Sequence, residues 1–401
     1  MNRKTISRRK FLTDAALAGT GVALAGYSYP GHAGERAPAV NIGIIGTGDR
    51  GGGLASIIQK IPGIRLAACC DPLPFRLANG MKYADRQTRE YSDYRFLLDS
   101  KQVDAVVVAT PFNTHADIAV DALDAGKHVY CEKTMAYGYR DIGRLCKKVK
   151  DANLVFQTGH QYHSSRLYRH IVELVQQGKI GRVAALECQW NRNGDWRRPV
   201  PDPKWEKSIN WRMYREYSGG LMAELCSHQI DFSNWVLGAH PVKVTGFGGI
   251  DFWQDGRETY DNVHVITEYP SGVKAKYSSL TTNRKDGYQI KIMGKEGTIV
   301  INKGQAWLFS EAGKSKDKAI VDGVTGATQS GWGPAGVAID IEHKEPSLQA
   351  MLDFKQAVLS RTNPQSNVKS GAEVSVVVQM ALDAMDNGRV EHWKDEYNFA
   401  G

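Results

Sequence analysis

Apolar and polar positions follow two different patterns along this chain. From residue 40 to residue 160, short and nearly uninterrupted apolar runs alternate with helix-like stretches. Such runs are typical of strands that are buried on both faces of a parallel sheet. The pattern therefore predicts an α/β domain over residues 40–160, with strands at 40–45, 64–70, 103–109, 128–131 and 154–158.

Beyond residue 161 the sequence reads as a succession of strands, some of them separated by the tight-turn sequences at 270–272 and 295–297. Successive strands with tight turns predict a mostly antiparallel sheet. We expect a second, α+β domain over residues 161–390, in which helices cover one face of a large open sheet. The other face would be free to meet a partner subunit, which predicts a homo-oligomer. The predicted strands are 183–190, 242–248, 263–269, 273–280, 288–293 and 298–302, the predicted helices lie near 165–178, 221–237, 346–360 and 371–387, and 311–337 is a predicted surface loop.

The first 33 residues have the pattern of a targeting segment. Arg8 and Arg9 precede Phe11 and Leu12, a mildly apolar stretch runs from 15 to 26, and Gly31-His32-Ala33 is a small-x-small cleavage site. These features favour a twin-arginine signal peptide, and therefore a periplasmic or extracytoplasmic protein that is exported folded. A Sec signal or a basic disordered tail is the alternative.

Composition and charge narrow the classes of partner. The 401 residues carry a formal charge of +8, but five Lys/Arg and one Asp lie within residues 1–33, so about +4 remains after cleavage. No run of basic residues interleaved with aromatic ones follows the leader, and neither does a long apolar run, so we expect no nucleic acid and no membrane anchor. The six cysteines form neither a CxxC pair nor a disulfide framework, which fits folding in a reducing compartment.

A glycine-rich turn follows the first predicted strand. Gly46, Gly48 and Gly51 form a GxGxxG sequence between that strand and a helical stretch at 53–60. In this context the first glycine makes the tight turn, the second lets the backbone approach a pyrophosphate, and the third lets the helix pack on the strand. The sequence therefore predicts a dinucleotide site, within which Arg50 is a further candidate contact.

An acidic residue ends the second predicted strand. Asp71 lies 25 positions after Gly46, near the distance at which a ribose-binding acid is expected. A carboxylate there accepts hydrogen bonds from the ribose hydroxyls and repels a 2′-phosphate, so we expect NAD and not NADP. The alternative is a turn aspartate before Pro72.

Two further polar segments follow predicted strands of the same sheet. Because ligands of open parallel sheets lie at the carboxyl ends of the strands, we expect these segments to contact the nicotinamide half of the cofactor. They contain Thr110, Pro111 and His115 in one case, and Glu132 and Lys133 in the other.

Together these features resemble the Gfo/Idh/MocA family of sugar and polyol oxidoreductases. The resemblance covers residues 40 to about 390 and includes the glycine turn, Asp71, the segment 110–115, Glu132-Lys133 and the stretch 210–231. It implies a Rossmann domain followed by a substrate domain, a nicotinamide cofactor and a carbohydrate substrate.

Two positions depart from the family pattern. The family's Glu-Lys-Pro reads Glu132-Lys133-Thr134 here, which leaves the geometry of the loop around Lys133 open. The family's aspartate four residues before the helix histidine is Glu224, which keeps the charge and lengthens the reach by one methylene.

Glu224 and His228 are spaced i, i+4, so they share one face of a helix and could converge on one substrate. Removing a hydride from a carbinol carbon requires a base for the hydroxyl proton, and histidine is the usual one near neutral pH. The resemblance implies that His228 takes this proton, that Lys133 stabilises the alkoxide and that Glu224 orients the sugar or His228. The alternative is a structural Glu224–His228 pair and a solvated Lys133.

Other residues are candidates for substrate contact. His160 and Tyr162 follow the strand at 154–158, and Arg212 lies in the family-like stretch. The segment 190–205 is rich in tryptophan, arginine and proline, and includes Trp196; it reads either as a substrate rim or as an oligomer contact. His160 and His163 lack a third metal-ligand partner, so we expect no metal.

The leading hypothesis is an enzyme that transfers a hydride between tightly bound NAD and a hydroxyl-bearing carbon of a sugar, glycoside or polyol. Tight binding is expected because free nicotinamide coenzyme is scarce outside the cytoplasm. One alternative is a redox-neutral enzyme that cleaves or eliminates through transient oxidation. Another is a non-catalytic carbohydrate-binding relative. The sequence leaves the sugar, the oxidised carbon and the number of subunits open.

Overall fold

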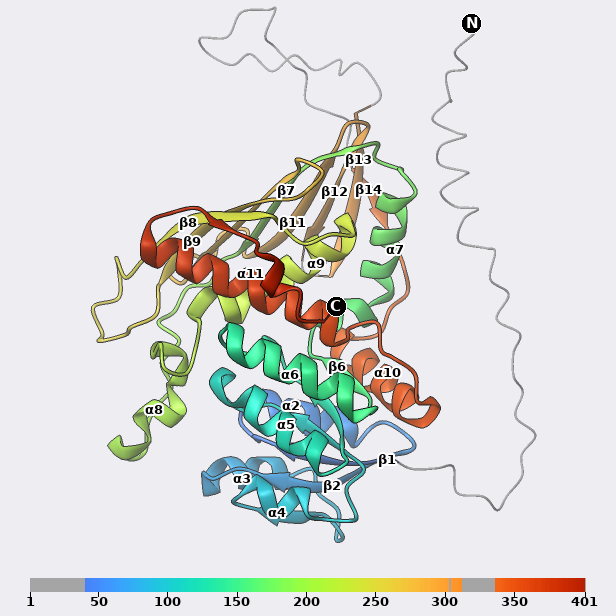
Figure 1. Cartoon of the computed structure of the whole chain (residues 1–401), viewed down its shortest axis with the longest axis vertical. Helices are drawn as coiled ribbons and strands as arrows, with labels where there is room; N and C mark the ends of the chain where they lie inside the picture. The colour runs from blue at the N-terminus through green and yellow to red at the C-terminus, as the bar shows by residue number, and fades with distance from the viewer. Residues whose placement is uncertain (1–39, 303, 312–335, 401) are drawn as a thin grey trace, which may run out of the picture. The chain divides into compact units, whose positions relative to one another are not determined.

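The first sheet has six parallel strands in the order β3-β2-β1-β4-β5-β6, which confirms the predicted doubly wound domain (Figure 1). The computed structural model describes residues 40–302, 304–311 and 336–400, so the predicted leader and most of the predicted loop 311–337 lie outside the described residues. The strand order changes direction between β1 and β4, where open α/β sheets form a crevice. The strands are β1 (Val40–Ile45), β2 (Ile64–Cys70), β3 (Arg89–Tyr91), β4 (Ala105–Val108), β5 (His128–Cys131) and β6 (Phe156–Thr158).

Helices cover both faces of this sheet. One face packs against α2 (Asp49–Ile58), α3 (Pro74–Met81) and α10 (Pro346–Ser360), and the other against α4 (Tyr94–Leu98), α5 (His115–Asp124) and α6 (Tyr139–Ala152). Helix α10 comes from the part of the sequence that we assigned to the second domain, but Phe354 on it packs edge-on against Tyr130 of β5. The two domains are therefore not separated in the structure at residue 161, because a helix from the later part of the sequence packs on the first sheet.

The second sheet has nine strands in the order β14-β13-β12-β11-β7-β10-β9-β8-β15. The pair β7–β10 is parallel and the others are antiparallel, which confirms the expected mostly antiparallel sheet. The strands are β7 (Val183–Trp190), β8 (Lys243–Gly249), β9 (Asn262–Glu268), β10 (Lys274–Leu280), β11 (Tyr288–Gly294), β12 (Gly297–Asn302), β13 (Gln305–Ser310), β14 (Val337–Ile339) and β15 (Glu391–His392).

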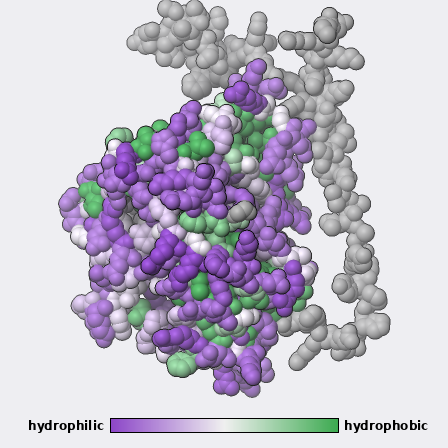
Figure 2. Space-filling view, viewed as in Figure 1, coloured by the Kyte–Doolittle hydropathy of each residue, from purple (hydrophilic) through white to green (hydrophobic). Residues whose placement is uncertain are grey.

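Among the described residues, helices cover one face of the second sheet and none covers the other. Helices α7 (Arg166–Gln176), α9 (Ser227–Leu237) and α11 (Val368–Asn387) pack together over the covered face, and α11 also packs on α6 (Figure 1). The apolar core is continuous from the first sheet to the second. On the uncovered face, Phe247 is 81% exposed and Ile266 is 48% exposed. The side of the molecule in Figure 2 is mostly hydrophilic with small separate hydrophobic areas.

Candidate active site

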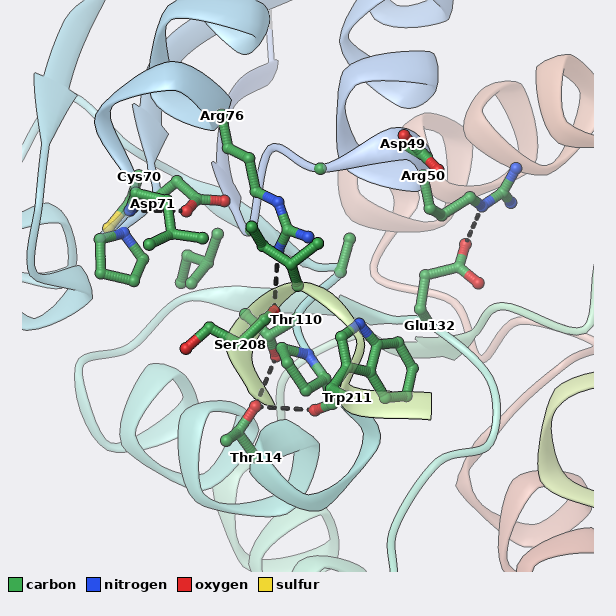
Figure 3. A pocket seen from close by; sticks show the side chains of 18 of the residues that line it. Asp49, Arg50, Cys70, Asp71, Arg76, Thr110, Thr114, Glu132, Ser208 and Trp211 are labelled. Atoms are coloured by element: carbon green, nitrogen blue, oxygen red, sulfur yellow. Dashed lines mark hydrogen bonds and ion pairs between the residues drawn. The ribbon is translucent and has the colours of Figure 1, made fainter. Parts of the chain in front are cut away.

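A cavity of about 1140 Å³ opens at the carboxyl ends of the first sheet. Its inner wall is formed by the residues that end β1, β2, β4 and β5, and its outer wall by segments of the second domain (Figure 3). The predicted residues Gly46, Gly48, Arg50, Asp71, Thr110, Pro111, His115, Glu132, Lys133, Arg212, Glu224 and His228 all line it.

The glycine turn has the shape that a dinucleotide requires. Gly46 has φ +87°, and a Cβ on it would lie 2.7 Å from the carbonyl oxygen of Ala109. A Cβ on Gly51 would lie 1.8 Å from the carbonyl oxygen of Gly46, so this glycine is needed for helix α2 to pack on the turn. Gly48, by contrast, would have no protein atom closer than 3.8 Å to a Cβ, so it leaves space at the cavity. The turn therefore fits a pyrophosphate. Helix α2 begins at Asp49, four residues before the predicted start at residue 53.

Asp71 is held in place by the backbone. It is 4% exposed, and the N–H groups of Thr47 and Leu73 each donate to its carboxylate at 2.9 Å. Burial raises the pKa of Asp71 above its ordinary value, although these hydrogen bonds act in the opposite direction. Arg76, on α3, lines the same part of the cavity and was missed from the sequence. The sequence signal that could have identified Arg76 was its position five residues after Asp71, the predicted ribose-binding acid.

His115 ties together two loops that border the cavity. Its ring nitrogens lie 2.8 Å from the carbonyl oxygen of Thr134 and 3.0 Å from that of Thr110. Burial lowers the pKa of His115. This arrangement makes His115 a support for Thr110 and for the Lys133 loop.

Arg50 links the glycine turn to the loop after β5. Its Nε donates to Glu132 at 2.7 Å, as Figure 3 shows, and its Nη1 donates to the hydroxyl of Ser347 on α10 at 3.0 Å. Its Nη2 is buried without a hydrogen-bond partner among the described residues. Arg50 therefore fixes Glu132, next to Lys133, and keeps one donor free.

Lys133, Glu224 and Arg212 form a charged group at the other end of the cavity. The Glu224 carboxylate accepts a hydrogen bond from Arg212 Nε at 2.8 Å and lies 3.8 Å from Lys133 Nζ. Burial alone would raise the pKa of Glu224, but the two cations outweigh it and the pKa is lowered. Burial lowers the pKa of Lys133, and the charge of Glu224 opposes this.

A π-helical turn, Met222–Cys226, precedes α9 and carries Glu224. In this wider turn the N–H of Ser227 bonds to the carbonyl of Met222 and not to that of Ala223, as it would in an α-helix. The carbonyl of Ala223 instead accepts from the Ser227 hydroxyl at 2.6 Å and from the Thr134 hydroxyl at 2.9 Å, and that of Glu224 accepts from Lys133 Nζ at 3.1 Å. The π turn therefore positions the Lys133 loop through its backbone. The Lys133–Thr134 peptide bond is cis.

His228 lies one turn beyond Glu224 and lines the cavity. Its ring packs against Trp190 and Tyr162, with ring centroids 5.6 and 5.3 Å away. Its Nδ1 has no hydrogen-bond partner among the described residues. Burial, followed by the charge of Lys133, lowers the pKa of His228 well below 6.5, so the imidazole is neutral at pH 7. A neutral imidazole can accept a proton.

Three of the candidate substrate residues lie outside the cavity wall. His160 is fully buried behind His228, with ring centroids 6.0 Å apart, and Tyr162 supports the ring of His228. Trp196 lies beside Arg192, whose Cζ is 5.7 Å from the ring centroid of Trp196. None of the three is among the lining residues. Sequence position alone did not distinguish the wall from the layer behind it.

The layer behind His228 is itself polar. His160 Nδ1 and His163 Nε2 lie 4.0 and 3.0 Å from the same carboxylate oxygen of Asp231. Within residues 40–302, 304–311 and 336–400, no group of three or more His, Cys, Asp or Glu side chains is arranged to hold a metal ion. In the same part of the chain, no helix combines the length and the apolar character that crossing a bilayer requires.

Comparisons with known proteins identify the family. Residues 40–160 match the oxidoreductase family, NAD-binding Rossmann fold, and residues 168–300 match the GFO/IDH/MocA C-terminal domain. The chain belongs to the Gfo/Idh/MocA family of oxidoreductases. It is an NAD-binding member, with the cavity between the two matched regions.

Individual relatives align with about two thirds or more of this chain. An uncharacterized oxidoreductase of Streptococcus pneumoniae is 34% identical over 65% of this chain and 68% of its own. A 2,7-anhydro-N-acetylneuraminate hydratase of Escherichia coli is 29% identical over 66% of this chain and 68% of its own. A levoglucosan dehydrogenase of Pseudarthrobacter phenanthrenivorans is 22% identical over 76% of this chain and 83% of its own. The structure of a levoglucosan dehydrogenase in complex with NADH and L-sorbose matches with a TM-score of 0.71 and 19% identity, over 89% of this chain and 99% of that one.

Proposed function

We propose that this protein is an NAD-dependent oxidoreductase that transfers a hydride between tightly bound nicotinamide and a hydroxyl-bearing carbon of a sugar, glycoside or polyol. One observation carries the proposal: a single cavity joins the glycine turn and Asp71 to Lys133, Glu224 and His228. A non-catalytic relative would have no need to place a buried lysine, a second cation and a neutral histidine beside a nucleotide site.

Each of the three residues has a chemical role that follows from its surroundings. His228 is neutral and lines the cavity, so it accepts the proton of the substrate hydroxyl. Lys133, held by the π turn, donates to the oxygen on which negative charge develops. Glu224 is fixed by Arg212 and orients the sugar through its carboxylate. Bound NAD supplies the hydride acceptor, and in a redox-neutral cycle also the donor.

The carbohydrate substrate class rests on relatives. The levoglucosan dehydrogenase and the 2,7-anhydro-N-acetylneuraminate hydratase act, by their names, on carbohydrate derivatives. A buried cavity end with a base, a cation and a fixed carboxylate suits a substrate with several neighbouring hydroxyl groups.

A second candidate function is a redox-neutral one, and the similarity to a hydratase favours it. Transient oxidation of a ring carbon acidifies the neighbouring C–H, which permits elimination of a leaving group. Returning the hydride then gives a product with no net oxidation. The same three residues serve this cycle, because each oxidation and reduction needs a proton acceptor, a donor and a fixed substrate.

Two further proposals concern the whole protein. The leader sequence supports export by the twin-arginine route, after folding and after NAD is bound. The uncovered face of the second sheet, with Phe247 and Ile266 exposed, supports a homo-oligomer formed through that sheet.

The test is mass spectrometry of the cofactor released from the denatured protein, followed by a panel of sugars and glycosides. We expect NAD(H) because of Asp71; NADP(H) as the main species would overturn that assignment. We expect absorbance near 340 nm on adding a substrate. Product analysis then separates net oxidation, which leaves a ketone or lactone, from cleavage or hydration. Bound NAD with no reduction by any carbohydrate would contradict the proposed substrate class.

A further inference from the structure

Part of the second domain forms the outer wall of the nucleotide end of the cavity. This cover segment is Arg198–Trp211, and it contains a 3₁₀ turn, Pro203–Trp205, followed by the short helix α8, Glu206–Ile209. It contributes Arg198, Pro199, Pro201, Ser208, Ile209 and Trp211 to the cavity lining.

The cover segment is braced to its own domain. The backbone N–H of Arg198 donates to the side-chain oxygen of Asn210 at 2.7 Å, and the Asn210 amide donates back to the Arg198 carbonyl at 3.2 Å. These bonds hold the two ends of the segment together. The neighbouring Arg197 bonds Glu206 at 2.6 Å and Asp255 at 3.1 Å. The segment therefore behaves as one unit attached to the second domain.

Three contacts cross from the cover segment to the first domain. Arg198 Nη2 lies 2.9 Å from the carboxylate of Asp49, at the first turn of α2. Arg76 Nη1 donates to the carbonyl oxygen of Ser208 at 3.3 Å, as Figure 3 shows. The rings of Trp205 and Phe75 lie 5.4 Å apart. Asp49, Phe75 and Arg76 all come from the nucleotide-binding elements α2 and α3.

The three contacts with the first domain are more exposed to solvent than the hydrogen bonds between Arg198 and Asn210. The Arg198 and Asp49 side chains are 60% and 82% exposed, so water and salt weaken their attraction. The hydrogen bond to Ser208 is also exposed. The ring pair is partly solvent-accessible, since Phe75 is 41% exposed. Such exposed contacts with α2 and α3 can break without unfolding of either domain.

The contacts between the cover segment and the first domain lie beside the glycine turn. A Cβ on Gly48 would lie 3.8 Å from atoms of Arg76, so Arg76 stands over the glycine turn while it contacts the cover segment. Asp49 follows Gly48 directly. The contacts therefore close over the pyrophosphate site, and not over Lys133 and His228.

We propose that Arg198–Trp211 is a cover over the dinucleotide, and that the Asp49–Arg198, Arg76–Ser208 and Phe75–Trp205 contacts act as a latch that slows cofactor release. The proposal rests on NAD binding in this cavity, and not on the carbohydrate chemistry. Opening of the latch limits the exchange of NAD with solution.

The experiment measures the rate at which bound NADH leaves when excess NAD⁺ is added, by stopped-flow fluorescence. Trp205→Ala is the most direct variant because Trp205 is not among the cavity-lining residues, so it removes the latch contact without removing a wall residue. We expect release about 10-fold faster for Trp205→Ala, and about 3-fold faster for Arg198→Ala, as suits a partly exposed ring contact and an exposed ion pair. Lys207→Ala is the matched control, because Lys207 lies in the same segment and pairs with Glu216 of its own domain; its release rate should equal that of the wild type.

Asp49→Asn separates a latch from direct phosphate binding by Arg198. If Arg198 simply bound the phosphates, removing the Asp49 charge would free Arg198 and slow the release of NADH. A latch requires the opposite, faster release. Slower release in Asp49→Asn, or an unchanged rate in Trp205→Ala, would overturn the proposal while leaving the proposed function intact. A protein that binds no NADH would overturn both, and failure of the sugar panel alone would leave the latch standing.

Discussion

At the scale of single residues, the charge state of each titratable group at the reactive end of the cavity depends on its neighbours. His228 is buried near a cation and stays neutral, whereas Glu224 is buried between two cations and stays charged. We therefore expect His228→Ala and Lys133→Ala to lower the turnover step by roughly 100-fold or more while NAD remains bound. Glu224→Gln should do less damage, because the amide keeps the shape and some hydrogen bonds.

The test compares the turnover rates of the three variants. The amount of NAD released from each denatured variant serves as the control for folding. If Glu224→Gln were as inactive as His228→Ala is expected to be, while His228→Ala stayed near wild type, the carboxylate would be the base. Normal turnover in all three variants would place the reaction elsewhere.

The pH dependence of sugar oxidation should follow the same two groups. His228 must be unprotonated to accept a proton, and burial puts its pKa well below 6.5. Lys133 must be protonated to donate, and burial puts its pKa below 10.5. The kcat/KM profile should therefore fall on the acid side only below pH 6.5, and should fall on the alkaline side before pH 10.5. An acid limb centred above pH 6.5 would contradict the assignment of His228.

The sequence predicted the residues that line the cavity better than those that support it. Gly46, Asp71 and Lys133 follow strands of a parallel sheet, and the geometry of such a sheet brings strand ends together. Arg76 and Arg198 were missed because their roles depend on contacts between α3 and a distant segment. His160 was placed at the wall, but nothing in its sequence position distinguishes the wall from the layer behind it.

At the scale of elements, the π turn before α9 explains how Thr134 can replace the family proline. The Ala223 carbonyl released by this turn accepts the Thr134 hydroxyl, a bond that proline cannot make. Thr134→Val keeps the size of the side chain and removes this donor, so we expect a loss of about 1 kcal/mol in the free energy of unfolding and a lower kcat. Denaturant unfolding and steady-state kinetics measure the two effects. Thr134→Ser is the matched control and should keep both near wild type; equal losses in the two variants would contradict a role for the hydroxyl.

Most strands of both sheets could be predicted because each carries a strong apolar signal over several residues. The start of α2 could not, since its first residues include three glycines, which favour turns unless the preceding strand fixes the backbone. Strand β13 (Gln305–Ser310) was missed because it has few fully buried side chains. The π turn has nearly the same apolar pattern as an α-helix, so its sequence gives no separate signal.

At the scale of the whole molecule, the pattern of α10 shows only that one face is buried. It does not show which sheet covers that face, and α10 packs on the first one. The two domains also share one continuous apolar core. The proposed export would therefore have to carry both domains across as one folded unit.

The proposed export by the twin-arginine route gives a direct prediction. Replacing Arg8 and Arg9 together with lysine keeps the charge and removes the paired arginines that the route recognises. We expect the variant to stay in the cytoplasm with its leader uncleaved, as judged by fractionation and the mass of the protein. Unchanged export would point to a Sec signal, and residues 1–33 would then have been misinterpreted.

Four of the five buried histidines of the described residues make the stability of the protein sensitive to acid. Burial lowers the pKa of His115, His128, His160 and His228 below the ordinary value of 6.5, so below pH 6.5 the unfolded chain binds more protons than the folded one. The free energy of unfolding must then fall as the pH falls, by up to about 2 kcal/mol for each histidine between pH 6.5 and pH 5. Denaturant unfolding at pH 7.5 and pH 5 measures the difference. His160→Gln removes one of the four groups without removing a cavity-wall residue, so the difference should shrink in that variant. An equal difference in the variant and the wild type would mean that His160 keeps its proton on folding.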